Sequence, residues 1–241
     1  MNILVTGGAS GLGGAITKRL ADDENNNNIY FTYNQSKGSA EKIESDFNNT
    51  TSIKCDFRNP IEIKAIRDKI KDFDLDVLIN NAFSGDFLKT YFHKVDANDF
   101  LDDFQFNIMP VIEITQESII SFRKKKFGKI ITILSSALVN IPPIGSSVYI
   151  ANKAYLEELT KVWANENAKF NITSNSISPA LMLSNLTKDV DERVIDQIIE
   201  NHPLKKLLTF EEVAETVLFL VNASSQINGI DIIINAGVNV K

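Results

Sequence analysis

The feature that most constrains the fold of this chain is a glycine-rich turn placed directly after its first apolar run. Ile3-Leu4-Val5 is followed by Thr6-Gly7-Gly8-Ala9-Ser10-Gly11-Leu12-Gly13, and Leu12, Ile16 and Leu20 then recur at helical spacing. This order predicts a strand, a tight turn and a helix. Such a turn points backbone N–H groups and a helix N-terminus at one spot, which suits a pyrophosphate. A glycine-rich turn also occurs without a ligand, so the rest of the chain decides between the two interpretations.

Strand and helix patterns alternate along the rest of the chain. Apolar runs predict strands at residues 3–5, 29–33, 52–56, 76–80, 130–134, 172–177 and 230–234, with helical patterns between them, one of them long and running from Phe100 to Ile119. This alternation is typical of an α/β fold. We predict a Rossmann doubly wound parallel sheet of about seven strands with helices on both faces. Residues 1–241 form a single domain in this prediction, residues 180–206 a substrate lid, and residues 23–28 a loop without chemistry.

Composition and charge narrow the class of partner. The chain has 241 residues, 44% of them hydrophobic, and a formal net charge of −6, which argues against nucleic acid or an anionic membrane as the main partner. No apolar run approaches the roughly 20 residues of a membrane span, and the first residues lack the pattern of a signal peptide. The lone cysteine, Cys55, cannot form an intrachain disulfide. We therefore expect a soluble cytoplasmic protein.

Tyr149 and Lys153 are the first candidates for proton chemistry. If Tyr149 opens a helix, Lys153 lies one turn on and on the same face. A nearby ammonium favours the phenolate and lowers the tyrosine pKa from about 10, as exchange of a proton with an alcohol or carbonyl oxygen requires. Ser136 follows the strand predicted at 130–134 and projects from its carboxyl end, where open parallel sheets bind ligands. Ser135 is interpreted as strand packing.

The end of the second predicted strand bears on the choice of dinucleotide. A Rossmann fold usually places an acid there, which holds the ribose 2′-hydroxyl of NAD. This chain reads Asn34-Gln35-Ser36-Lys37 and offers a hydroxyl and a cation instead of a carboxylate. The sequence therefore favours NADP(H) over NAD(H). The alternative is that Lys37 is only a solvated surface charge.

Several other residues are candidates that the sequence alone does not assign. His93 and His202 are isolated from any ligand pattern, so we predict neither a metal site nor a catalytic histidine. Arg123-Lys124-Lys125-Lys126 ends a predicted helix, where cations complement the dipole; the alternative is the docking of an acidic carrier protein. Two interpretations, a substrate mouth and loop packing, stay open for three aromatic residues: Phe87, Tyr91 and Phe92.

With these residues laid out, the chain resembles the short-chain dehydrogenase/reductase family, and within it the 3-oxoacyl-(acyl carrier protein) reductases. Asn107, Ser136, Tyr149 and Lys153 fall at the order and spacing of the catalytic tetrad of that family. The resemblance implies an NAD(P)-dependent oxidoreductase that transfers a hydride between nicotinamide and a carbonyl or secondary alcohol, a 3-oxoacyl thioester being one candidate substrate. It further implies a homo-oligomer, dimer or tetramer, and a water held by Asn107 that links Lys153 to solvent.

The resemblance also implies which residues contact the cofactor. Asp56 corresponds to the acid that meets the adenine, Asn80-Asn81-Ala82 to the strand-four motif behind the cofactor, and Ser184 to a threonine that touches the carboxamide or a phosphate. The full set implied to bind the cofactor is Gly7, Ser10, Gly11, Leu12, Gly13, Asn34, Ser36, Asp56, Asn81, Ala82, Tyr149, Lys153, Pro179, Met182 and Ser184.

Three residues depart from the pattern of the family. Phe83 stands where a glycine usually follows Asn-Asn-Ala, Ala180 replaces the glycine after Pro179, and Asn152 replaces a serine or alanine before Lys153. None of the three removes a chemical group, so they bear on cofactor affinity and substrate identity more than on reaction type. Two alternatives stay open: a dinucleotide-sensing regulator without turnover, and a reductase of a sugar, steroid or small ketone.

Overall fold

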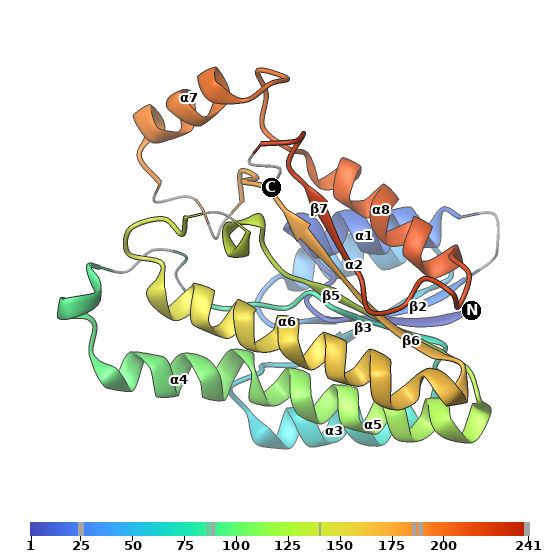
Figure 1. The fold of residues 1–241 in the computed structure, drawn as a ribbon. Helices are drawn as coiled ribbons and strands as arrows, with labels where there is room; N and C mark the ends of the chain where they lie inside the picture. Colours follow the sequence, from blue (N-terminus) through green and yellow to red (C-terminus); the bar gives the residue numbers. More distant parts are fainter. Residues whose placement is uncertain are drawn as a thin grey trace.

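The computed structural model describes residues 1–23, 27–85, 87, 90–139, 141–184, 187 and 190–238. In these residues seven strands form one sheet in the order β3-β2-β1-β4-β5-β6-β7, and every neighbouring pair is parallel (Figure 1). The strands are β1 (Asn2–Val5), β2 (Asn28–Tyr33), β3 (Thr50–Lys54), β4 (Val77–Asn80), β5 (Gly128–Ile133), β6 (Ile172–Pro179) and β7 (Asp231–Ile234). The predicted doubly wound sheet is confirmed, and each predicted strand overlaps one of these.

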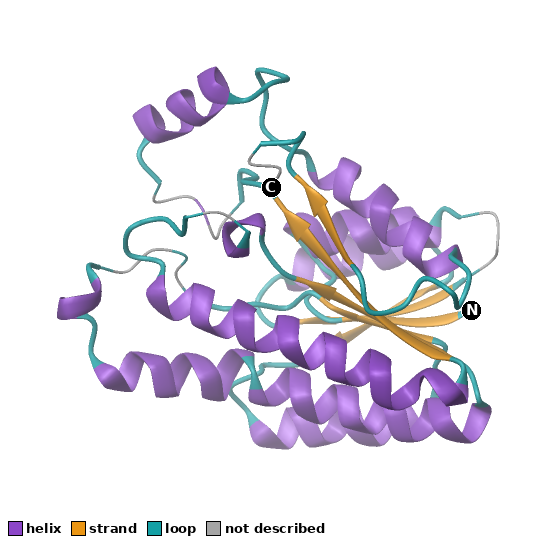
Figure 2. Cartoon of the chain, in the orientation of Figure 1, coloured by secondary structure: helices purple, strands orange, loops and turns teal. Residues whose placement is uncertain are grey.

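Helices cover both faces of the sheet, as Figure 2 shows. One face packs against α1 (Gly11–Ala21), α2 (Lys37–Asp46) and α8 (Phe210–Asn222), and the other against α3 (Pro60–Asp72), α4 (Ala97–Asn107), α5 (Met109–Lys125) and α6 (Ser147–Asn167). Short 3-10 helices in the described part of the chain include η1 (Phe92–Lys94), η2 (Ser136–Leu138) and η3 (Ala168–Phe170). The remaining helix, α7 (Glu192–Asn201), lies beyond the carboxyl ends of β6 and β7 and has no buried residue (Figure 1).

The point at which the strand order reverses lies between β1 and β4. The chain leaves β1 toward β2 on one side and leaves β4 toward β5 on the other, so the connections diverge at their carboxyl ends. Ligands bind in that crevice in open α/β sheets. The Thr6 hydroxyl ties the two strand ends together: it donates to the Ile79 carbonyl (3.2 Å) and accepts from the backbone N–H groups of Asn81 (2.9 Å) and Ala82 (3.0 Å).

The long helix predicted between Phe100 and Ile119 is two helices, α4 and α5, which meet at Ile108. Pro110 in the first turn of α5 explains the break, because proline has no N–H to donate to the carbonyl four residues earlier. The break leaves Asn107 as the last residue of α4, where its side chain turns toward the segment that follows β4.

The loop predicted at residues 23–28 is shorter than expected, and its residues 24–26 lie outside the described part of the chain. Asn28 already belongs to β2. Asn27 is buried; its amide donates to the Leu20 carbonyl (3.3 Å), and its side-chain oxygen accepts from the N-terminal ammonium (3.2 Å). Among the described residues no helix combines the length and apolar character that a membrane crossing requires.

Candidate active site

A cleft of about 1260 Å³ opens at the carboxyl ends of the strands and extends to α7. All the residues implied to bind the cofactor line it, and so do Ser136, Tyr149 and Lys153. Asn107 is the exception, because it is buried behind the segment that follows β4. The structure therefore brings the predicted cofactor set and three of the four predicted catalytic residues to one surface.

The glycine turn packs too closely for side chains. Gly7 and Gly11 have φ values of +66° and +54°, and a Cβ on Gly13 would lie 2.1 Å from the Gly7 carbonyl oxygen. The Asn81 amide donates to the carbonyls of Thr6 (2.9 Å) and Gly7 (3.3 Å), which ties the end of β4 to the turn. Ser10, the N-cap of α1, makes no side-chain capping bond, so its side chain leaves the first N–H groups of that helix to a ligand. These features fit the pyrophosphate of a dinucleotide.

Gly13→Ala tests this turn. The new methyl group would collide with the backbone of Gly7 and force the turn apart, so we expect at least tenfold weaker binding of NADPH and NADH, measured by nucleotide fluorescence. Gly38→Ala is the matched control, because a Cβ at Gly38 would meet nothing within 4 Å. Wild-type affinity in a folded Gly13→Ala protein would contradict a dinucleotide site at this turn.

The adenosine end of the cleft combines hydroxyl groups with one cation that the sequence analysis missed. The Ser36 hydroxyl donates to the Ser10 hydroxyl at 3.3 Å. The side chain of Lys37 is 73% exposed and pairs with Glu41 (3.4 Å), and it does not line the cleft. Arg58 does line it, with its guanidinium 5.4 Å from the centre of the Phe106 ring.

At the centre of the cleft, α6 lies next to the carboxyl end of β5. Tyr149 and Lys153 lie one turn apart on α6, and both are buried. The side chain that hydrogen-bonds the Tyr149 hydroxyl is that of Ser135, not Ser136. This contact favours Ser135 over the predicted Ser136 as the partner of the phenol, while both serines line the cleft. Spacing alone does not separate two adjacent serines: Ser135 keeps the extended conformation of β5 (φ −160°, ψ 138°), whereas Ser136 already begins η2.

Burial dominates the protonation of this pair. Burial raises the pKa of Tyr149 to about 12, and the Ser135 hydrogen bond opposes that shift. Burial lowers the pKa of Lys153 to about 8, and the Asp103 carboxylate opposes that shift. The Lys153 ammonium donates to the Ile133 carbonyl at 2.7 Å rather than to the phenol oxygen. The expected lowering of the tyrosine pKa is thus reversed, and Tyr149 holds its proton at neutral pH.

Asn107 orders the backbone beside this centre. Its side-chain oxygen accepts from the Ser84 N–H and its amide donates to the Ser84 carbonyl, both at 2.8 Å. One turn earlier on α4, the buried Asp103 accepts a 2.5 Å hydrogen bond from Asn152, the neighbour of Lys153. The water predicted at Asn107 stays a prediction.

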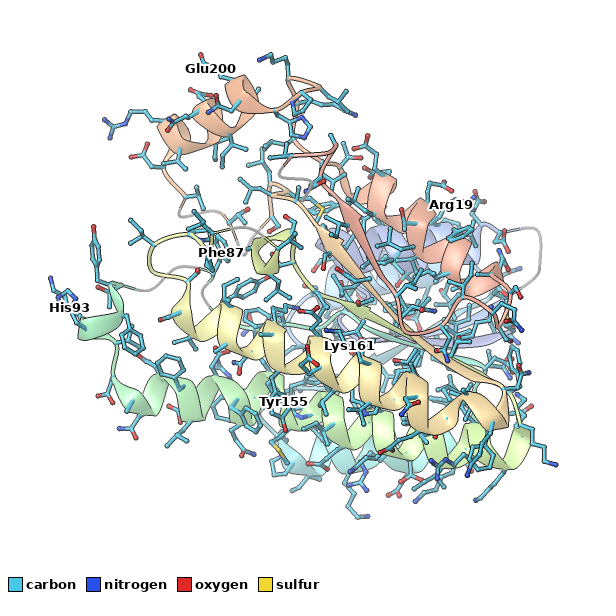
Figure 3. The ribbon with its side chains drawn as sticks, viewed as in Figure 1. Arg19, Phe87, His93, Tyr155, Lys161 and Glu200 are labelled. Atoms are coloured by element: carbon cyan, nitrogen blue, oxygen red, sulfur yellow. The ribbon has the colours of Figure 1, made fainter. Side chains whose placement is uncertain are left out.

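Aromatic rings flank the phenol on the substrate side. The rings of Phe83 and Phe87 meet the Tyr149 ring nearly at right angles, with centroids 5.1 and 5.0 Å away. Figure 3 shows Phe87 near the amino end of α6. Tyr91 and Phe92 are 57% and 72% exposed and do not line the cleft. Of the three aromatic candidates, the structure therefore brings only Phe87 to the site.

The far wall of the cleft comes from the segment predicted as a lid. Val194 and Ile198 of α7 line it beside Gln197, Asn201 and His202. Residues 185, 186, 188 and 189 of that segment lie outside the described part of the chain. Leu181, Met182, Leu183 and Val190 of the same segment also line the cleft, so apolar side chains outnumber polar ones in this wall. Such a wall suits a substrate whose carbonyl carries an apolar substituent.

The comparisons with known proteins agree with this fold. Residues 7–239 match the family described as Enoyl-(Acyl carrier protein) reductase. The chain belongs to the short-chain dehydrogenase/reductase family. Relatives include the 3-oxoacyl-(acyl-carrier-protein) reductase FabG of Buchnera aphidicola, which is 32% identical over 97% of this chain and 95% of its own length. FabG of Staphylococcus aureus is 29% identical over 97% of this chain and 96% of its own. A solved structure titled a putative betaketoacyl-ACP reductase superposes with a TM-score of 0.84, at 25% identity over 98% of this chain and 97% of that chain.

As a short-chain dehydrogenase/reductase, the chain is an NAD(P)-dependent oxidoreductase that acts on carbonyl or CH–OH groups. The structure also brings to the cleft a residue that the sequence analysis missed. Thr187 is buried, and its hydroxyl accepts from the Ser184 N–H (2.9 Å) and donates to the Met182 carbonyl (2.8 Å), so it shapes the loop beside the cleft. The sequence signal for this residue was a threonine three residues after Ser184, but only the structure shows that its side chain is buried.

The basic run at the end of α5 lies at the end of the sheet opposite the cleft, because it directly precedes the start of β5. Arg123 donates to the Asn167 side chain (2.7 Å), and Lys125 pairs with Asp74 (3.0 Å) and Asp76 (2.6 Å). These contacts favour the helix-end interpretation over a docking surface beside the active site. His93 lies on η1, at the outer edge of the view in Figure 3, and does not line the cleft.

Proposed function

We propose that this chain reduces the 3-keto group of an acyl thioester, with NADPH as the reductant. The observation that carries the reaction type is the meeting of Tyr149, Ser135 and Lys153 in the cleft that begins at the glycine turn. Support for the substrate class comes from the 32% identical relative, which is named a 3-oxoacyl-(acyl-carrier-protein) reductase. Apolar side chains in the cleft wall, among them Leu181, Leu183 and Val194, also support it.

In this proposal the residues act on one carbonyl oxygen. Bound nicotinamide supplies the hydride that reaches the carbonyl carbon. Tyr149, which keeps its proton at neutral pH, gives it to the developing alkoxide. Ser135 donates a hydrogen bond to the same oxygen and stabilises charge that appears in the transition state. Lys153 places a positive charge next to the phenol ring, with its Nζ 5.8 Å from the centroid.

The preference for NADP(H) rests on the polar end of the cleft. Ser10, Ser36 and Arg58 offer two hydroxyls and a guanidinium to a 2′-phosphate. We expect Ser36→Asp to raise the KM for NADPH at least tenfold, because a carboxylate repels the phosphate and binds a free 2′-hydroxyl. The KM for NADH should change little or fall.

The control for this prediction is Lys37→Ala, which removes a cation that is paired with Glu41 outside the cleft. It should leave both KM values within about twofold, as screened surface charges do. A loss of NADPH selectivity in Lys37→Ala, with none in Ser36→Asp, would place the phosphate site elsewhere.

The experiment for the whole proposal is a turnover assay with purified protein. NADPH and NADH oxidation is measured against 3-oxoacyl thioesters, 2-enoyl thioesters, simple ketones and ketosugars. The proposal predicts that NADPH with a 3-oxoacyl thioester has the highest kcat/KM. Turnover confined to another class would overturn the substrate and keep the reaction type, and binding without turnover would favour a dinucleotide sensor.

Two expectations about the protein as a whole belong to the same proposal: a homo-oligomer and a cytoplasmic location. Light scattering on the purified protein measures the first, and a dimeric or tetrameric mass is the expected result.

A further inference from the structure

Phe83 lines the cleft, and the proposed chemistry gives it no role. It follows Asn80-Asn81-Ala82 at the carboxyl end of β4, and its ring lies close to the two buried groups of α6, Tyr149 and Lys153. The ring centroid is 5.1 Å from that of Tyr149, with an interplanar angle of 79°. The Lys153 Nζ lies 5.4 Å from the same centroid. One aromatic side chain therefore contacts both members of the proton-transfer pair.

The surroundings of Lys153 favour an interaction of its ammonium with this ring. The ammonium is buried, and among the described residues the structure gives it one hydrogen-bond acceptor, the Ile133 carbonyl. A desolvated ammonium with unfilled donor capacity favours the negative face of an aromatic ring. The Phe83 ring is the nearer of the two aromatic rings beside Lys153, the other being Tyr149 at 5.8 Å.

We propose that Phe83 is a positioning residue whose ring holds the Lys153 ammonium between β5 and Tyr149 and keeps it charged. The consequence for catalysis rests on the proposed function, whereas the contact itself does not. An ammonium held in this place stays beside the phenol throughout the reaction.

Other charged groups act on Lys153, and the contribution of Phe83 is separable from theirs. Asp103 of α4 favours the ammonium form of Lys153. Its carboxylate accepts a 2.5 Å hydrogen bond from Asn152, a contact that does not involve Phe83. Tyr149, on the same helix as Lys153, is neutral at the pH values concerned because burial raises its pKa to about 12. A change at residue 83 leaves the contact of Asp103 with Asn152 in place, and the Phe87 ring still packs against Tyr149.

The direction of the effect follows from the contact. A ring that favours the ammonium raises the pKa of Lys153, while burial lowers it, with a net value of about 8. Phe83→Leu keeps an apolar side chain that excludes water but removes the ring face. The pKa of Lys153 should then fall by about one unit, the size expected of a desolvated cation–π contact.

The test is an NMR pH titration of isotope-labelled lysine Cε groups in the full-length protein without added nucleotide. The Lys153 signal is assigned by its absence from Lys153→Arg. Phe83→Leu should shift the midpoint of that signal downward by about one pH unit, and Phe83→Tyr, which keeps a ring face, should restore it. Phe92→Leu is the matched control, since Phe92 is 72% exposed and does not line the cleft. An unchanged or raised midpoint in a folded Phe83→Leu protein would overturn the proposal.

An enzymatic readout separates this proposal from the proposed function. If the chain turns over a carbonyl substrate, the basic limb of kcat against pH should move down in Phe83→Leu in parallel with the NMR midpoint, and not in Phe92→Leu. A protein without turnover in any panel would refute the proposed function, and the NMR titration would still decide the role of Phe83.

Discussion

Tyr149→Phe is expected to lower kcat by about two to four orders of magnitude while the Kd for NADPH stays within about twofold. The phenol holds its proton at neutral pH, because burial raises its pKa to about 12, and its hydroxyl contacts Ser135. Removing that hydroxyl takes away the donor to the developing alkoxide and leaves the glycine turn untouched. Stopped assays of product formation at saturating NADPH measure the change.

Tyr155→Phe is the control for this prediction. Tyr155 lies on the same helix, is 44% exposed, packs edge to face against Phe104 (5.2 Å) and does not line the cleft. It should behave as wild type. Unchanged turnover in Tyr149→Phe would remove the tyrosine from the mechanism.

Ser135→Ala is expected to lower kcat by about two to three orders of magnitude, the cost of losing one hydrogen-bond donor to an oxyanion. Its neighbour supplies the matched control: Ser136→Ala removes the same group one residue further on, where the chain has turned into η2. We expect Ser136→Ala to change kcat by no more than a few fold. The measurement is kcat and KM for both variants under identical conditions.

The reverse outcome, a large loss in Ser136→Ala and little in Ser135→Ala, would restore the assignment made from spacing. It would also mean that the contact of Ser135 with Tyr149 has no part in turnover.

The sheet could be predicted from the sequence because buried parallel strands are continuous apolar runs. β5 is buried along its whole length, and its residues 130–133 belong to such a run. The break between α4 and α5 was also visible as Pro110, but the apolar spacing across it continues from Phe104 to Val111 and conceals it.

The site was predicted in outline and corrected in detail. Tyr149 and Lys153 follow from spacing on one helix, whereas the choice between Ser135 and Ser136 depends on where β5 stops being extended. The pKa of Tyr149 depends on residues far away in sequence, because Phe83 and Phe87 cover its ring. Spacing along a chain does not report burial of this kind.

The cation at the adenosine end shows the same limit. Lys37 was the available candidate because it follows the second strand, yet its ammonium is paired with Glu41. Arg58 follows the third strand, and only the parallel pairing of β2 with β3 brings it to the cleft.

The most direct test of this account is a fluorescence titration of the purified protein with NADPH and NADH, followed by turnover with 3-oxoacyl thioesters. The account predicts saturable binding of both nucleotides, tighter for NADPH, and oxidation of NADPH that depends on the thioester. Binding of neither nucleotide would contradict it, because the glycine turn, the cleft and the residues around Tyr149 would then not form a dinucleotide site.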